Sequence, residues 1–321
     1  MRVHPNSFLL ALLLLAITAL FPPGARAEKK IGVLLYSEEA RYYDSLKGIR
    51  EQLAKAGFKE PAVKYIIGNA GGNKAKAADL VRGFARGDLS LMITLGTNAT
   101  IAAAREIRDI PIIFSMVYDP IEARVAKDWK TSGTNATGVS PRISMADLVT
   151  RLKEVRPVRR IAALYTPGEK NSESQLKELQ EIQERFAVKV VPVIISRKED
   201  VGQFLPDVLP TVDALYLSGS SVIGSTIPPV VELAVKARVI TITHLEDLVQ
   251  QGVMLGVCSD PYQLGVMAGK KAVATLKGAR PSTIPIEYMA KPGLYINRKT
   301  ATATGIRLPK DFQQKAARIF E

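Results

Sequence analysis

Polar side chains follow several apolar runs of this sequence, at the points where those runs end. They are the hydroxyl and amide side chains of Ser37, Thr97, Asn98, Ser220 and Ser221. Each stands where a helix is expected to begin, and a helix N-terminus offers unpaired backbone N–H groups and the positive end of the helix dipole. These positions predict a site for a carboxylate. The same hydroxyls also suit helix capping, and one side chain can serve both purposes.

Two acidic residues and two tyrosines add complementary chemistry at similar positions. Asp119 and Glu38 can accept a hydrogen bond from a ligand ammonium group. Tyr118 and Tyr165 end or follow apolar runs, so they can stack on a ring or donate from the hydroxyl. Each has a plainer alternative, because an aspartate before proline is common in turns and tyrosines at strand ends commonly pack against the core.

Catalytic and metal-binding side chains are scarce. The chain contains two histidines, His4 and His244, and one cysteine, Cys258. A serine hydrolase would have to use His244, and the serine pair at 220–221 lacks the G-x-S-x-G setting of a nucleophile. Neither phosphate-binding glycine motif occurs, and no metal-ligand spacing is present. The sequence therefore predicts a binding protein without metal or cofactor rather than an enzyme, and an exported hydrolase is a remote alternative.

Residues 1–27 have the pattern of a secretory leader. A basic residue precedes the apolar run 8–21, and a Pro-Pro-Gly break separates that run from Ala25-Arg26-Ala27, a small-x-small cleavage pattern. The run is shorter than the roughly 20 residues of a membrane span, which argues against the alternative of an uncleaved anchor. The residue after the cleavage pattern is Glu28 and the one cysteine, Cys258, lies far along the chain, which argues against lipid attachment at the cleavage site. We expect cleavage after Ala27 and a periplasmic protein.

Length and charge are compatible with a two-lobed binding protein. Without the leader 294 residues remain, enough for two lobes. The leader holds two of the 44 basic side chains and none of the 31 acidic ones, so the rest of the chain carries a net charge of +11. The charges are spread along the chain, which favours a solvated surface over a nucleic-acid interface. A bias toward anionic ligands is the alternative interpretation.

Apolar strand-like runs alternate with helical segments along the chain. The expected strands are 31–36, 63–67, 91–95, 112–117, 160–165, 188–195, 214–217, 239–243 and 253–258. This alternation predicts parallel sheets covered by helices. Ligands of such sheets bind beyond the carboxyl ends of the strands, so two lobes that face each other would gather the polar residues around a shared cleft.

Four stretches, in this order and spacing, carry a family resemblance. They are Ile110–Phe114, Asp119-Pro120, Asn135–Ser140 and Leu164–Ser172. The chain resembles the ABC transporter substrate-binding family that includes tryptophan- and tyrosine-binding members, over nearly its whole mature length. The resemblance implies a type I periplasmic-binding-protein fold, with two Rossmann-like α/β lobes and a multi-segment hinge. On that fold we expect one lobe from 28–140 and 251–285, and the other from 141–250 and 286–321.

The resemblance also implies a function. A monomeric protein of this kind captures a small polar ligand, an amino acid or a related molecule, and delivers it to the membrane permease of an ABC transporter. A sensor kinase or chemoreceptor is the alternative partner. Asp247 aligns with an acidic position of the family and is expected at the hinge or against the ligand. The chain departs from the family pattern at Gly96–Asn98, Tyr118–Pro120 and Ser218–Ser221, where the ligand should lie, so the ligand is unnamed.

Overall fold

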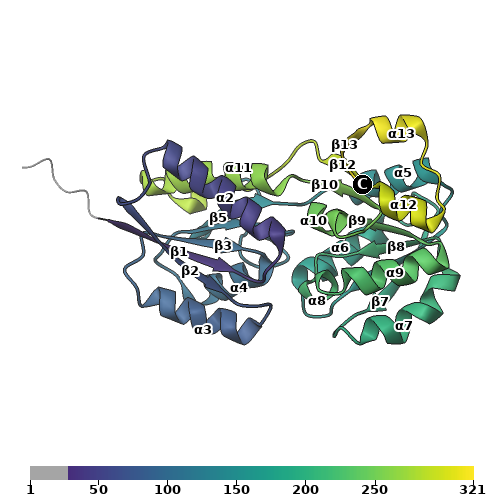
Figure 1. Ribbon diagram of the computed structural model, residues 1–321. Helices are drawn as coiled ribbons and strands as arrows, with labels where there is room; N and C mark the ends of the chain where they lie inside the picture. Colours follow the sequence, from purple (N-terminus) through teal and green to yellow (C-terminus); the bar gives the residue numbers. More distant parts are fainter. Residues whose placement is uncertain (1–27) are drawn as a thin grey trace, which may run out of the picture.

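The computed structural model describes residues 28–321, and the expected leader with its cleavage site lies outside the described residues. Two lobes lie side by side, and the chain passes between them more than once (Figure 1). Each lobe is a twisted sheet flanked by helices, which confirms the predicted α/β class with two lobes. No helix in the described part of the chain has both the length and the apolar character that a membrane crossing requires.

The first lobe is built on a six-stranded sheet with the order β11-β5-β4-β3-β1-β2, in which every pair is parallel. Its strands are β1 (Lys29–Leu35), β2 (Val63–Asn69), β3 (Leu91–Leu95), β4 (Ile112–Ser115), β5 (Ala136–Ser140) and β11 (Glu287–Tyr288). Its helices are α2 (Ala40–Lys55), α3 (Lys74–Ala85), α4 (Thr97–Glu106) and α11 (Pro261–Leu276), with the short 3-10 turn η2 (Pro281–Thr283). The central strands are fully buried, as strands covered on both faces should be.

The second lobe contains a seven-stranded sheet with the order β13-β12-β10-β9-β8-β6-β7. Its strands are β6 (Arg160–Tyr165), β7 (Lys189–Ile194), β8 (Ala214–Leu217), β9 (Ile240–Thr243), β10 (Leu255–Cys258), β12 (Gly293–Asn297) and β13 (Ala316–Phe320). Its helices are α5 (Met145–Val155), α6 (Lys170–Glu181), α7 (Asp200–Val208), η1 (Leu209–Thr211), α8 (Ser221–Gly224), α9 (Ile227–Ala237), α10 (Glu246–Gln250), α12 (Arg298–Thr304) and α13 (Lys310–Gln314). The pairing of β10 with β12 is antiparallel, and the other pairs are parallel.

Strand pairing differs from the expected lobe boundaries at two places. The range 251–285 was expected in the first lobe, but its strand β10 pairs with β9 and β12 of the second sheet. The range 286–321 was expected in the second lobe, but its strand β11 pairs with β5 of the first sheet. An apolar run predicts that a strand is buried and does not say which sheet it joins. We therefore propose that the chain changes lobe after β5, between β10 and α11, and between β11 and β12.

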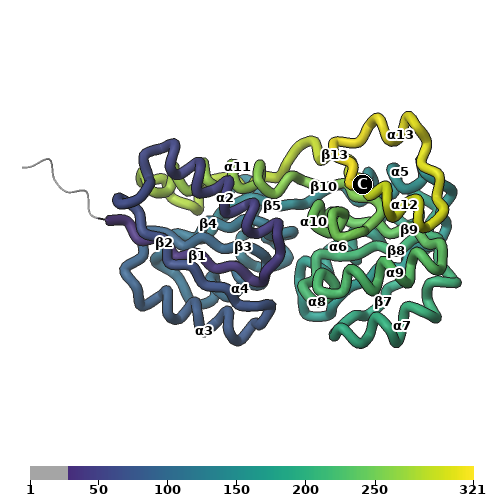
Figure 2. Tube along the Cα trace, in the orientation of Figure 1, coloured from purple at the N-terminus to yellow at the C-terminus, as the bar shows by residue number. Residues whose placement is uncertain are grey.

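Helix α11 belongs to the first lobe because it packs tightly on α2, far away in the sequence (Figure 2). A Cβ atom at Gly265 would lie 2.0 Å from the backbone oxygen of Ser45, and one at Gly48 would lie 2.3 Å from that of Tyr262. Glycine is therefore needed on both helices at this crossing. Gly269, one turn after Gly265, is packed as closely, since a Cβ there would meet the Gln52 side chain at 2.6 Å.

Candidate ligand-binding site

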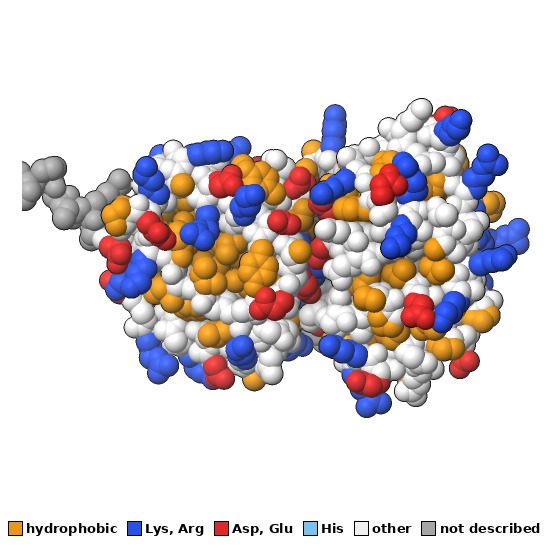
Figure 3. All heavy atoms as spheres, in the orientation of Figure 1, with side chains coloured by type: hydrophobic (Ala, Val, Ile, Leu, Met, Phe, Trp, Pro, Cys, Tyr) orange, Lys and Arg blue, Asp and Glu red, His pale blue; other side chains and the backbone are white. Residues whose placement is uncertain are grey.

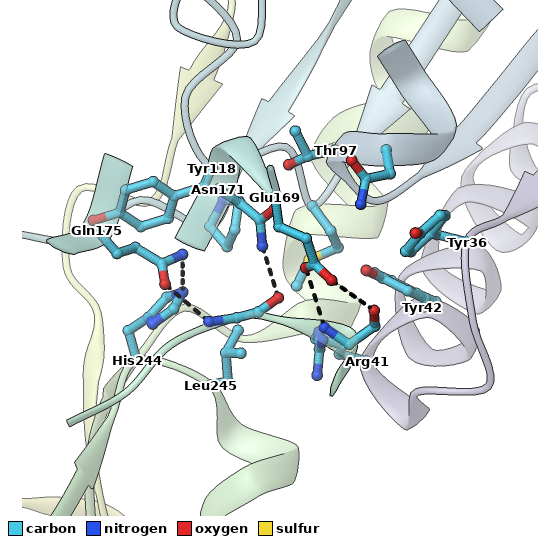
Figure 4. A pocket seen from close by; sticks show the side chains of 15 residues that line it. Tyr36, Arg41, Tyr42, Thr97, Tyr118, Glu169, Asn171, Gln175, His244 and Leu245 are labelled. Atoms are coloured by element: carbon cyan, nitrogen blue, oxygen red, sulfur yellow. Dashed lines mark hydrogen bonds between the residues drawn. The ribbon is translucent and has the colours of Figure 1, made fainter. Parts of the chain in front are cut away.

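A polar cavity lies between the two lobes, beyond the carboxyl ends of strands from both sheets (Figure 4). From the first lobe and its first crossover it is lined by Tyr36, Arg41, Tyr42, Thr97, Asn98, Met116, Tyr118 and Pro141. From the second lobe it is lined by Glu169, Asn171, Gln175, Gly219, Ser221, His244 and Leu245. Its volume is about 20 Å³, close to that of one water molecule. A larger ligand therefore needs the lobes or the lining side chains to move apart.

The N-terminus of α4 forms part of the wall on the first lobe. The residue before the helix is Gly96, with φ of 98°, and a Cβ there would lie 2.5 Å from the Tyr42 hydroxyl. No side chain in the described part of the chain caps this helix, so its first-turn N–H groups stay available. The hydroxyl of Thr97 is buried and has no hydrogen-bond partner within residues 28–321. These donors suit a ligand carboxylate.

Glu169 supplies a buried carboxylate from the second lobe. It is 5% exposed and accepts hydrogen bonds from the backbone N–H of Ser221 at 3.2 Å and from its hydroxyl at 3.0 Å. Burial raises the pKa of the Glu169 carboxyl, and the bonds from Ser221 oppose that rise. Lys74 donates to the backbone oxygen of Gly168 at 2.8 Å rather than to this carboxylate. No ion pair of Glu169 is present within residues 28–321, and a buried carboxylate of this kind is suited to a ligand ammonium group.

Arg41 lines the cavity, but its charge is already neutralised. Its guanidinium pairs with Asp247 of α10 at 2.7 Å and with Glu39 at 2.9 Å. Burial lowers the pKa of Arg41, but the two carboxylates outweigh that effect and raise it, so the group stays charged. Because α2 and α10 belong to different lobes, the pair of Arg41 with Asp247 holds the lobes together beside the cavity.

Aromatic side chains form much of the remaining lining. The Tyr118 ring meets His244 edge to face at 5.2 Å, and its hydroxyl donates to Glu178 at 2.7 Å. The hydroxyl of Tyr36 donates to the backbone oxygen of Gly72 at 2.8 Å. Burial raises the pKa of Tyr36 to about 12, and it lowers the pKa of His244 to about 3, so both groups are neutral at physiological pH. The cavity therefore combines apolar ring surface with a few directed polar groups.

The model of the ABC transporter substrate binding protein family matches residues 30–319 of this chain. The chain belongs to that family. Its members bind small solutes for ABC transporters and are not enzymes, as the sequence predicted.

Relatives and solved structures agree with this assignment. The chain is 26% identical to the tyrosine-binding protein of Clostridioides difficile, over 87% of this chain and 81% of the relative. An ABC domain from Streptococcus pneumoniae in complex with L-tryptophan is 29% identical, covers 92% of this chain and 100% of its own, and has a TM-score of 0.87. The ligand-free, open structure of a Clostridium difficile substrate-binding protein with adhesive properties is 25% identical, covers 91% and 99%, and has a TM-score of 0.72.

Four of the predicted ligand-binding residues line the cavity of this substrate-binding protein, namely Thr97, Asn98, Tyr118 and Ser221. Asp247 lies behind them, where it holds Arg41. Ser220 is fully buried as the N-cap of α8, with its hydroxyl 2.6 Å from that of Thr166. Capping, the alternative weighed for this serine, is what the structure shows. Ligand contact by any of these residues stays a prediction.

The other predicted residues lie away from the cavity. Ser37 and Glu38 line a separate groove at the outer edge between the lobes. Asp119 accepts from the backbone N–H groups of Ile121 and Glu122, both at 2.9 Å, so its carboxylate organises a turn. Tyr165 ends β6 and is not part of the lining.

Several lining residues were missed because they lie on helices, beyond the strand ends. Arg41 is on the first turn of α2, and Asn171 and Gln175 lie four residues apart on α6. That spacing puts both amides on one helix face, a pattern that could have drawn attention to them. Glu169 and Asn171 also lie inside the stretch that carried the family resemblance. Among residues 28–321, no group of three or more His, Cys, Asp and Glu side chains is arranged to hold a metal ion.

Proposed function

We propose that this substrate-binding protein captures an amino acid, or a closely related zwitterion, in the cavity between its lobes. The observation that carries the proposal is that one cavity has a site for a negative group on one wall and a site for a positive group on the other. The uncapped N-terminus of α4 and the unpartnered Thr97 hydroxyl suit a carboxylate, and buried Glu169 suits an ammonium group. The tyrosine-binding relative and the neighbour in complex with L-tryptophan support this ligand class.

The same arrangement suggests how binding drives closure. The two charged ends of the ligand are recognised by different lobes, since α4 belongs to the first and Glu169 to the second. A ligand that bridges them stabilises the closed arrangement over the open one. We propose that the exported, leader-free protein then presents this closed form to the permease of an ABC transporter, which accepts the ligand as the lobes reopen.

Thermal unfolding of the chain from Glu28, measured against a panel of amino acids, sugars and polyols, tests the ligand class. The protein should first be unfolded and refolded, to remove any ligand carried through purification. A binding amino acid is expected to stabilise the protein by about 2.7 kcal/mol at a hundredfold excess over its Kd. Stabilisation by a sugar or polyol, with none by any amino acid, would overturn the proposal.

The variant Glu169→Gln tests the ammonium site. It keeps an oxygen that can accept from Ser221 but removes the charge, so it should weaken amino-acid binding by roughly ten- to a hundredfold. Glu173→Gln is the matched control, because Glu173 is in the first turn of α6, the helix that begins just after Glu169, and pairs with Lys170 outside the cavity. The control should bind like the unaltered protein when both are measured by calorimetry. Equal affinities for the two variants would remove Glu169 from the site.

A further inference from the structure

Two amides on α6 clamp the backbone of one glycine in the turn after β8. Asn171 Nδ2 donates to the backbone oxygen of Gly219 at 2.7 Å, and the Gly219 N–H donates to Gln175 Oε1 at 2.8 Å (Figure 4). These bonds fix the orientation of both amides, because a backbone oxygen can only accept and a backbone N–H can only donate. A Cβ atom at Gly219 would lie 3.3 Å from Gln175 Nε2 and 3.4 Å from Asn171 Nδ2, so the clamp leaves little room for a larger residue.

The fixed amide of Gln175 in turn fixes the proton on His244. Gln175 Nε2 lies 3.2 Å from His244 Nε2, and an amide nitrogen can only donate, so this histidine nitrogen is the acceptor. The proton is then on Nδ1, which donates to the Tyr216 hydroxyl at 2.9 Å. That hydroxyl donates to Gln175 Oε1 at 3.3 Å, which closes a ring of three side chains. The ring requires neutral His244, in agreement with its strongly lowered pKa.

One hydrogen-bond donor of Gln175 is not used within the ring. Nε2 of Gln175 carries two hydrogens, one of which is used by His244, and the second has no partner among residues 28–321. Gln175 is only 1% exposed, and it lines the cavity beside His244 and Tyr118. Tyr216 is behind it and does not line the cavity. A donor held rigidly in a buried wall is costly to leave unpaired, so it favours ligands that bring an acceptor to it.

The surroundings of this donor are neutral. His244 is uncharged, and the hydroxyl of Tyr118 donates to Glu178, whose carboxylate is already paired with Arg142 at 2.8 Å. Arg41, the cationic side chain of the lining, is already paired with two carboxylates. Because these charged side chains are already paired with one another, a charged group on the ligand would have to compete with those pairs.

We propose that Gln175 determines specificity by donating this second amide hydrogen to a neutral oxygen on the ligand's side chain. This inference rests on the proposed function, because it takes the zwitterionic end of the ligand to be held by α4 and Glu169. The ligand class then narrows to amino acids with a neutral acceptor at the far end of the side chain, a phenol or a carboxamide, over apolar or charged side chains of similar size. The bond from the Gly219 N–H holds the Gln175 amide in place without Tyr216, and only Gln175 contacts the ligand through the donor.

Two matched ligand pairs test the inference. L-Tyrosine against L-phenylalanine, and L-glutamine against L-methionine, each compare an acceptor-bearing side chain with an apolar one of similar size. In whichever pair binds, the acceptor-bearing member should bind roughly tenfold more tightly in calorimetry. Gln175→Met should abolish that preference, so that the two members of the pair bind with about equal affinity. Tyr216→Phe removes a ring member behind the cavity wall and should keep the preference.

Three results would overturn the inference. They are a preference for the apolar member in the unaltered protein, a preference retained in Gln175→Met, or a preference lost equally in Tyr216→Phe. If Gln175→Met fails to fold, Gln175→Glu replaces it, because it keeps the acceptor for Gly219 and removes the amide donor. Binding of amino acids without discrimination would defeat this inference alone, whereas silence of the whole amino-acid panel would defeat the proposed function with it.

Discussion

The protonation of one side chain, Glu169, should control the affinity for an amino acid. Burial raises its pKa above the ordinary value of 4.5, and a ligand ammonium group would bind only the ionised form. Affinity should therefore fall as the pH drops from 7.5 through the raised pKa of the ligand-free protein. Calorimetry across that range should show the loss, and Glu169→Gln, already weak, should show a flatter dependence. A flat dependence in the unaltered protein would contradict this role.

The same shift has a consequence for stability. Because the folded pKa of Glu169 lies above the unfolded value, the folded ligand-free protein takes up this proton more readily than the unfolded chain between the two values. Its contribution therefore favours the folded state as the pH falls through that interval, and this contribution is lost as the pH rises. Glu169→Gln lacks this contribution. In denaturant titrations, the unfolding free energy of the unaltered protein minus that of Glu169→Gln should therefore increase as the pH falls through that interval.

At this scale the sequence predicted kinds of chemistry better than it predicted positions. Thr97 and Asn98 follow a strand directly, and the rule that sites lie beyond strand ends placed them at the cavity. Asp119 follows a strand too, but its carboxylate is used by its own turn. The proline after Asp119 favoured the turn that was its alternative, but the sequence does not show which backbone N–H groups lie near either side chain. Arg41 and Gln175 reach the cavity from helices, which that rule does not cover.

Among the elements, the close crossing of α2 and α11 fixes α11 to the first lobe. Its closest approach leaves no space for a side chain, so Gly265→Ala must push the two helices apart. We expect a loss of about 1–3 kcal/mol in the free energy of unfolding, measured by denaturant titration. Gly83→Ala is the control, because Gly83 is on α3 with nothing within 4 Å of its would-be Cβ. That control should gain about 1 kcal/mol from helix propensity. Equal effects of the two changes would rule out close packing.

The elements also show where sequence patterns stop being informative. Alternating apolar and helical segments predicted most of the strands and their covering helices. The short strand β5, with the sequence Ala136–Ser140, has little strand character and was not predicted, yet it is fully buried beside β4. Its backbone is paired because the neighbouring strand offers a free edge, which is a property of the assembled sheet. The sheets that β10 and β11 join likewise depend on which edge is free in the assembled sheet, and the sequence of either strand does not show it.

For the whole molecule, the arrangement of the lobes is the property that matters for transport. The cavity has room for about one water, and contacts such as Lys74 with Gly168 join the lobes at its rim. The overall similarity is greater to the L-tryptophan complex than to the open, ligand-free structure. We interpret the arrangement as a closed form. On the face in Figure 3, basic side chains are scattered among acidic ones and form no single positive patch. Repulsion between like charges on that face is therefore too diffuse to push the lobes apart.

The buried pair of Arg41 and Asp247 should set how readily this molecule closes. One oxygen of Asp247 has no partner within the described residues, so closure buries a carboxylate that is only half satisfied, and opening hydrates it. Asp247→Ala removes this one contact between the lobes and leaves Arg41 paired with Glu39. The ligand-free variant should open further, and ligand affinity should fall roughly tenfold because less of the protein is competent to close.

Small-angle X-ray scattering with and without a binding amino acid measures this directly. The Asp247→Ala protein should have a larger radius of gyration than the unaltered protein when ligand-free, and both should contract to a similar value at saturation. Glu232→Ala is the control, since Glu232 pairs with Lys236 on the exposed face of α9 within one lobe. An unchanged radius in Asp247→Ala would mean that other contacts at the rim, such as that of Lys74, hold the lobes together. The pair of Arg41 with Asp247 bridges the lobes beside the cavity. A weaker pair makes closure of the ligand-free protein less favourable, and the ligand then spends more of its binding free energy on closing the lobes.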